Sequence, residues 1–307
     1  MVTLDRIRLT GLLHEAPLRR GFAFPETSVR TRGLLTADCS MRARCGMQIG
    51  KPGEPVTHMS QAYPDRIEVR GRDLAGDLMG RLTFTEYFHL LVTGREPTEE
   101  ERYFLDLLLV AIAEHGMMPT NVAARMTLAA DPGSLQGAVA AGILGAGPVV
   151  LGTAEECARL LVEAQRKVEA GGQPTTVAGE LAAAIKDKGA KVPGFGHPVH
   201  RPIDPRAERI LELADERGVS GSHVVLARAF RDAVAEAWGK RLTMNVAMPM
   251  AAVMLDLGFS ADTVKAIPIL ARTAGLLAHL AEEHENPVGF LLAGAAEEAV
   301  TYEPRGE

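Results

Sequence analysis

The stretch PGFGHPVHRPIDPR, residues 193–206, places two histidines, two arginines and an aspartate among glycines and prolines. Glycines let a backbone approach a ligand closely, so His197 is expected at the tip of a loop. Asp204 followed by Pro205 is typical of an N-cap and the first turn of a helix, from which Arg206 would project. A third glycine and a preceding strand are missing, so a dinucleotide fingerprint is not indicated. The stretch instead predicts a loop that holds a polar, anionic substrate.

Composition limits the classes of protein that fit. The 307 residues are 47% apolar and 23% charged, enough to bury a sizeable core. A formal net charge of -6 does not favour nucleic acid as a partner. The three cysteines, Cys39, Cys45 and Cys157, lack the spacing of a zinc site, and no uninterrupted apolar run predicts a membrane span. We therefore expect a soluble cytoplasmic protein without a bound metal.

From about residue 66 the pattern predicts helices almost throughout, so the expected fold class is all-α. Ser134 is expected to open a buried helix rich in glycine and alanine, and Pro268 to kink or break the last long helix. The other predicted starts are Thr83, Thr98 with Glu101 as a capping box, Asp204, Ser222 and Ser260.

The first residues differ from the rest. Residues 1–57 carry an excess of arginine and lysine and no sustained apolar period, which predicts a poorly ordered basic extension. A dispensable tail is the favoured interpretation. A targeting segment, or an upstream start codon before Met47, stays an alternative.

With its neighbours, the 193–206 stretch resembles the GFGH-x-V-x(4)-DPR signature of the citrate synthase superfamily, which includes citryl-CoA lyase and part of ATP-citrate lyase. Three further segments, residues 67–101, 113–126 and 244–283, resemble that family in the same order. The resemblance implies a helical homodimer with a large domain, residues 58–152 and 244–307. It also implies a smaller, mobile CoA-binding domain, residues 153–243, that closes over a CoA thioester and excludes water.

The resemblance also implies roles for individual residues. His197 would contact the oxygen on the carbon whose bond is made or broken, and Arg206 and Arg272 would grip substrate carboxylates. His115 would bind substrate as well. The CoA contacts would come from Gly194, Phe195, Gly196 and Arg201. The alternatives are that His197 is a structural histidine and that Arg206 and Arg272 form ordinary salt bridges.

At three positions the sequence departs from the family pattern. Val150 stands where the family motif GPLHG has its histidine, and Ala247 where the family has the aspartate of Asn-Val-Asp. Asn286 stands where many members have the arginine of Arg-Pro. Condensation needs a base to form a carbanion, and Ala247 cannot act as one, so efficient citrate synthesis is not expected. With Asn286 in place of arginine, one of the groups that bind a substrate carboxylate is also missing.

Cleavage of the carbon–carbon bond depends less on the missing histidine and aspartate, because the departing enolate can take a proton from water. The leading prediction is a citryl-CoA lyase-like enzyme that splits a 3-hydroxyacyl-CoA, such as citryl-CoA, into acetyl-CoA and a 2-oxo acid such as oxaloacetate. It would need no cofactor beyond the CoA thioester. His197 would be the base, and the proton for the enolate would come from water or from a relocated acid at Glu114, Glu155 or Glu156. The alternatives are a degenerate paralogue that binds an acyl-CoA or a partner, and a citrate or methylcitrate synthase.

Overall fold

A computed structural model of the protein describes residues 56–147 and 149–305. The predicted basic extension falls, up to residue 55, outside the described residues. Most of the described chain is helical, which confirms the all-α prediction.

A small antiparallel sheet precedes the first helix and was not predicted. Its strands are β1 (Ser60–Ala62), β2 (Ile67–Val69) and β3 (Arg72–Asp73), paired in the order β1-β2-β3. Strands of two or three residues are too short to show an alternating pattern, so the sequence gives no periodic signal for them. A π-helical turn, η1 (Leu74–Leu78), follows the sheet.

The next two helices begin as predicted. Thr83 caps α1 (Phe84–Thr93) and Thr98 caps α2 (Glu99–Ala113), and in each case a glutamate three residues on completes a capping box. Gly94 ends α1 in the left-handed conformation, with φ 82°. These caps satisfy backbone N–H groups that would otherwise lack partners.

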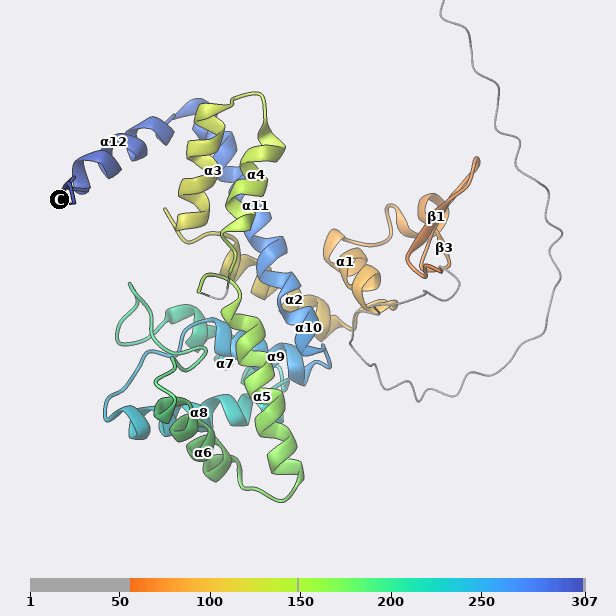
Figure 1. Ribbon diagram of the computed structural model, residues 1–307. Helices are drawn as coiled ribbons and strands as arrows, with labels where there is room; N and C mark the ends of the chain where they lie inside the picture. Colours follow the sequence, from red (N-terminus) through yellow and green to blue (C-terminus); the bar gives the residue numbers. More distant parts are fainter. Residues whose placement is uncertain (1–55, 148, 306–307) are drawn as a thin grey trace, which may run out of the picture. The chain divides into compact units, whose positions relative to one another are not determined.

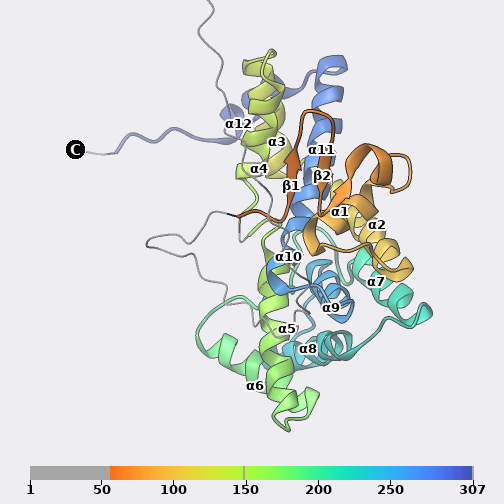
Figure 2. The same cartoon turned by 90° about the vertical axis from the view of Figure 1, so that its right-hand side faces the viewer.

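The remaining helices form two groups, which Figures 1 and 2 show from two sides. In one group α9 lies against α5, α7 and α8, and all its residues from Ala247 to Leu255 are buried. In the other, α3 packs against α4, α11 and α12. The bounds are α3 (Pro119–Ala130), α4 (Leu135–Leu144), α5 (Thr153–Glu169), α6 (Pro174–Asp187), α7 (Pro205–Glu216), α8 (Ser222–Trp238), α9 (Ala247–Asp256), α10 (Ala261–Val264), α11 (Ala266–Glu285) and α12 (Gly289–Ala299).

Helix α4 is only partly buried, so the prediction of a buried helix was wrong. Leu144 is 86% exposed and Leu135 44%, because only one side of the helix meets its neighbours. On that side Gly142 permits close approach. A Cβ there would lie 2.8 Å from the Leu276 side chain and 2.9 Å from the Thr120 carbonyl oxygen.

The predicted break at Pro268 is confirmed. Helix α10 ends at Val264 and α11 begins at Ala266, which places Pro268 in the first turn of α11. Proline has no N–H to donate to the carbonyl four residues earlier, that of Val264, so one continuous helix is disfavoured. By length and hydropathy alone, the stretch Ala261–Glu285 could cross a membrane. It carries the buried Arg272 and Glu283 and packs against α2, α3 and α4, as a core helix does.

Helix α8 is capped from another helix, which corrects the prediction that Ser222 is its N-cap. The N-cap is Gly221, and the Asp256 carboxylate at the end of α9 accepts the N–H groups of Gly221, His223 and Val224 at 2.8–3.0 Å. The His223 ring contacts the same carboxylate at 2.8 Å. Sequence spacing cannot reveal such a cap, since its acceptor lies more than thirty residues away.

We predict that Asp256→Ala lowers the free energy of unfolding by about 2–4 kcal/mol, because three N–H groups lose their acceptor. Burial alone would raise the pKa of Asp256, but the hydrogen bonds from His223 and the backbone outweigh burial and lower it. The carboxylate therefore stabilises the fold fully above the unfolded pKa of about 3.9, and the effect is lost as the pH falls through the folded pKa. Urea unfolding at pH 7 and pH 3 measures both effects.

The exposed Asp232, on α8 itself, supplies the control. Asp232→Ala should change the unfolding free energy by less than about 0.5 kcal/mol. Equal losses in the two variants, or a loss in Asp256→Ala that does not shrink at low pH, would contradict the proposed cap.

Candidate active site

The 193–206 loop is fastened to the segment that leads into α9. Gly194 and Gly196 both adopt positive φ, 78° and 89°. The Gly196 N–H donates to the Thr243 carbonyl at 2.7 Å, and the Asn245 N–H donates to the Gly194 carbonyl at 2.9 Å. The Asn245 side chain also donates to the Gly196 carbonyl at 3.0 Å. These bonds fix the backbone on both sides of Phe195, so the start of the loop and the start of α9 meet.

The His197 ring is oriented by its own loop. Its Nδ1 accepts backbone N–H groups from Val199 at 3.1 Å and from His200 at 2.9 Å. A nitrogen that accepts two hydrogen bonds carries no proton, so the neutral ring is protonated on Nε2. Burial, followed by the charge of His200, lowers the pKa of His197 and favours that neutral form. The ring therefore offers an Nε2–H donor.

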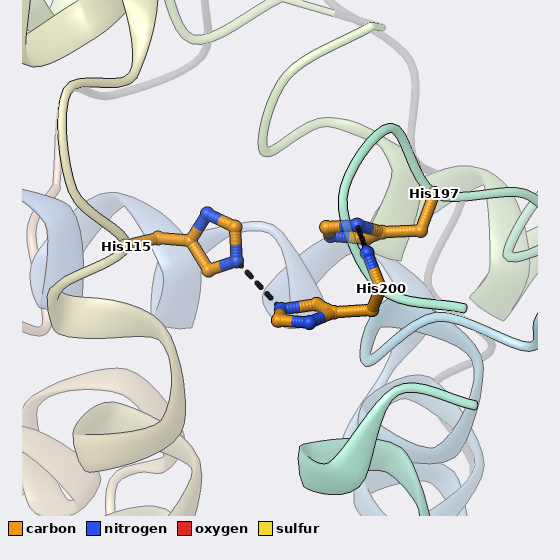
Figure 3. A group of neighbouring side chains, drawn as sticks. All are labelled: His115, His197 and His200. Carbon is orange, nitrogen blue, oxygen red and sulfur yellow. Dashed lines mark hydrogen bonds between the residues drawn. The ribbon is translucent and has the colours of Figure 1, made fainter. Parts of the chain in front are cut away.

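Three histidine rings gather at this point: His115, at the end of α2, with His197 and His200 (Figure 3). The Nε2 atoms of His115 and His200 lie 3.0 Å apart, and the centroids of His197 and His200 are 4.3 Å apart. Their ligating atoms lie within 4.8 Å of one another, a proximity that would suit a metal ion. A metal on Nε2 of His197 would require the proton on Nδ1, where two N–H groups already point. The cluster does not fit a three-histidine metal site.

Arg272 is a buried cation without a carboxylate partner. Its residue is only 3% exposed, Nη1 donates to the Asn121 side chain at 3.1 Å, and Nη2 to the Ile112 carbonyl at 3.3 Å. Its Nε has no hydrogen-bond partner, and no carboxylate of the described residues lies within 4.0 Å of it. Burial lowers the pKa of Arg272, but a guanidinium stays charged at neutral pH. The charge of Glu114, which itself pairs with His279, acts on Arg272 from a longer distance, so this guanidinium is a candidate for binding an anion.

Arg206 stands in a different electrostatic position. It forms a two-pronged pair with Asp204, with Nε 3.0 Å from Oδ1 and Nη2 2.8 Å from Oδ2. Asp204 is completely buried and also accepts the N–H groups of Arg206 and Val246, and it caps α7 as predicted. The charge of Arg206 is therefore already balanced within the protein.

These groups surround a cavity of about 480 Å³. Its polar lining consists of His115, His197, Arg206, Arg272, Asn245 and Thr153, and no carboxylate lies among its lining residues. Most of the remaining wall is apolar and includes Val149, Val150, Leu151, Val246, Ala247 and Met250. Val150 and Ala247, the two departures from the family pattern, thus both face the cavity.

The structure brings four predicted residues to one cavity, His115, His197, Arg206 and Arg272, together with Gly196. Gly194 and Phe195 shape the loop without lining the cavity, and Arg201 is exposed to solvent. Of the acids considered as replacements, Glu114 pairs with His279 at 2.9 Å and Glu155 with Arg159 and Lys265. Neither lines the cavity, and nor does Glu156.

Sequence reasoning missed some residues that organise this site. They are Asn245, which ties the loop to α9, and Asn121, which holds Arg272. His200, which contacts both other histidines, is visible in the sequence beside the motif, where the favoured interpretation gives it no contact with substrate. Asn245 lies inside a quoted motif, so its neighbourhood was visible. Asn121 lies in a helix far from Arg272 along the chain, and its contact depends on packing.

Comparison with known proteins identifies the family. Residues 57–289 match the family described as citrate synthase, C-terminal domain, and the chain belongs to the citrate synthase family. It is 32% identical over 212 residues to a citrate synthase of Heyndrickxia coagulans, a match that covers 67% of this chain and 53% of that protein. The chain thus spans about half the length of the curated relatives it matches.

Two solved structures are similar. Citryl-CoA lyase from Hydrogenobacter thermophilus superposes with a TM-score of 0.72 at 28% identity, over 83% of this chain and 96% of that one. ATP citrate lyase of Methanosaeta concilii, in complex with (3S)-citryl-CoA, gives a TM-score of 0.66 at 22% identity, over 84% of this chain and 43% of that one. The second likeness bears on the fold alone.

We predict that Gly194→Ala destabilises the protein more than Gly196→Ala. Both substitutions force alanine to a positive φ, which costs about 1–2 kcal/mol. At Gly194 the new Cβ would also lie 2.8 Å from Cys157 Sγ and from Met248 Cβ, whereas nothing lies within 4 Å at Gly196. We expect a total loss of about 3 kcal/mol or more at Gly194. Chemical unfolding measures both, and equal losses would show that the loop does not pack as described.

Proposed function

We propose that the protein cleaves a 3-hydroxyacyl-CoA carrying a free carboxylate, citryl-CoA or a similar thioester, to acetyl-CoA and a 2-oxo acid. The observation that carries this proposal is the buried Arg272, which lines the same cavity as the Nε2–H donor of His197 and pairs with no carboxylate of the described residues. A carboxylate on Arg272 would place the neighbouring oxygen-bearing carbon beside a hydrogen-bond donor. The CoA thioester is the substrate, and the proposal needs no further cofactor.

In the proposed reaction the His197 Nε2–H donates to the substrate oxygen and stabilises negative charge as it develops there. The expectation that His197 removes the hydroxyl proton does not fit its hydrogen bonds, since Nε2 already carries a proton. We assign proton removal to His115, the other histidine of the cavity lining. Burial, followed by the charge of Arg206, lowers the pKa of His115, which leaves it unprotonated at neutral pH.

The bonds then balance as follows. The hydroxyl proton passes to His115, the oxygen forms the carbonyl of the 2-oxo acid, and the carbon–carbon bond breaks. Its electron pair moves onto the thioester fragment as an enolate, which takes a proton from water to give acetyl-CoA. The hydroxide that remains takes the proton from His115, which restores both the water and the neutral histidine. No carboxylate lines the cavity, so the carboxylate base that the family pattern supplies for removing a proton from acetyl-CoA is missing among the described lining residues.

The apolar lining supports cleavage over condensation. Val150 and Ala247 leave apolar surface where the family pattern supplies an enolate donor and a carboxylate base. The same two substitutions favour the second candidate, a catalytically inactive relative that binds an acyl-CoA.

We propose in addition that the protein assembles as a homodimer in the cytoplasm and that Arg201 contacts CoA. The exposed side chains of Leu135 and Leu144 on α4 and of Phe290 and Leu291 on α12 support self-association, since apolar surface of this kind favours burial against a partner. The exposed position of Arg201 leaves its charge available to a CoA phosphate.

We expect the purified protein to release a 2-oxo acid from 3-hydroxyacyl-CoA substrates, measured by coupled reduction of the product. His197→Ala should lower kcat by about a hundredfold or more, with CoA affinity nearly unchanged, because one transition-state donor is lost. His284→Ala, at an exposed histidine on α11, is the control and should retain full activity. If no product forms while CoA still binds, the proposed enzymatic activity is rejected. The second candidate, a catalytically inactive protein that binds an acyl-CoA, is then favoured.

Ala247 provides a second test. In D2O the wild-type protein should not exchange the methyl hydrogens of acetyl-CoA, because its cavity lacks a carboxylate base. Ala247→Asp places a carboxylate at the first position of α9 and should raise exchange by about a hundredfold. Ala247→Asn, of equal size but unable to accept a proton, should not; equal exchange in both variants would contradict this account.

A further inference from the structure

The turn that follows α2 is tied to α11 by two polar side chains that do not line the cavity, those of Glu114 and His279. Glu114 Oε2 lies 2.9 Å from His279 Nε2. We propose that Glu114 and His279 are positioning residues of the site, and that their contact holds His115 at the cavity. The inference rests on the proposed function for the part that His115 plays in the reaction.

One oxygen of the Glu114 carboxylate fixes the backbone of the turn. Oε1 accepts the His115 N–H at 2.8 Å and also accepts the Gly116 N–H. Burial alone would raise the pKa of Glu114, but the hydrogen bonds from His279 and from these two backbone groups outweigh burial and lower it. The carboxylate is therefore ionised, and it holds the piece of backbone from which the His115 ring projects.

The surroundings of the His279 ring fix which of its nitrogens carries the proton. Nδ1 faces Nη1 of Arg125 at 3.2 Å, and a guanidinium can only donate. Nε2 lies 2.8 Å from the Asn121 amide nitrogen, which is also a donor, and 2.9 Å from the Glu114 carboxylate. Among these three described neighbours only Glu114 can accept a proton. The ring proton therefore lies on Nε2 and is donated to Glu114.

The donor to Glu114 is itself held in place. Arg125, which faces the other side of the His279 ring, is only 1% exposed. Its Nε donates to Glu283 at 2.6 Å and its Nη1 to Glu282 at 2.7 Å, and both acids lie on α11 with His279. A ring anchored in this way can fix the position of a flexible carboxylate that contacts it.

Helices α2 and α11 also approach closely where the turn begins. They lie side by side in Figures 1 and 2, and a Cβ added at Gly275 of α11 would collide with the carbonyl oxygen of Ala113, the last residue of α2. The same helix α11 carries Arg272, which lines the cavity. The contact of His279 with the turn therefore sets the position of His115 relative to Arg272.

Two variants break the contact from opposite sides. Glu114→Gln keeps one oxygen for the backbone N–H groups of the turn, but its amide group then meets the His279 Nε2–H donor to donor. His279→Leu removes the donor itself. We expect each substitution to lower kcat for thioester cleavage by about tenfold and to leave CoA affinity within about twofold, because the base is misplaced. Rates are compared at a temperature at which urea unfolding shows every variant to be folded.

The conservative variant His279→Gln distinguishes positioning from packing. Its side-chain amide can accept from Arg125 and donate to Glu114, so kcat should return to within about threefold of the wild-type value. His284→Leu, at an exposed position of the same helix, controls for a leucine on α11 and should leave kcat unchanged. Equal losses in His279→Gln and His279→Leu, or an unchanged kcat in Glu114→Gln, would overturn the inference.

The placement of His115 can also be followed without any reaction. Diethyl pyrocarbonate modifies accessible unprotonated histidine rings, and mass spectrometry compares half-buried His115 with exposed His58 as an internal reference. A released turn should open more often, so we expect His115 to be modified at least about threefold faster in Glu114→Gln and in His279→Leu. If the wild-type protein cleaves no thioester, the proposed function fails while this rate still tests the contact. An unchanged rate in both variants would overturn the inference.

Discussion

The buried Asp204 carboxylate connects the parts of the molecule that make up the site. It accepts N–H groups from the backbone and side chain of Arg206 and from the backbone of Val246. Burial alone would raise the pKa of Asp204, but the bonds and charge of Arg206 outweigh burial and lower it, so the group stays ionised. One fixed negative charge thereby joins the end of the 193–206 loop, the start of α7 and the start of α9. The chemistry depends on that junction, because His197 and Ala247 lie on either side of it.

Arg206 and Arg272 differ in the partners that the protein gives them. A buried carboxylate needs a cation, and Arg206 provides it from within the same turn of helix. Arg272 is held by an amide and a carbonyl and pairs with no carboxylate of the described residues. The two arginines of the cavity therefore differ in their protein partners, and Arg272 is the one that we propose for the substrate carboxylate.

The sequence predicts the helical fold, the capping boxes and the break near Pro268 because these depend on residues close together in the chain. The short strands, the cap of α8 by Asp256 and the exposed face of α4 depend on packing between distant segments, which spacing alone does not encode. At the site, the motif identifies His115, His197, Arg206 and Arg272. It cannot show which nitrogen of His197 is protonated or which arginine is already paired, and those two facts determine the proposed mechanism.

The loop that carries Val150 shows how the apolar wall is held in place. Leu151 adopts φ 68°, a left-handed conformation that is costly for a residue with a branched side chain, by about 1–2 kcal/mol. Backbone bonds from Val150 and Gly152 to the Gly147 carbonyl close the turn around it. The fold therefore accepts local strain to keep Val150 and Leu151 facing the cavity, where the family motif has a histidine and a glycine. A glycine at position 151 would relieve this strain, so the leucine side chain is kept against the cavity at a conformational cost.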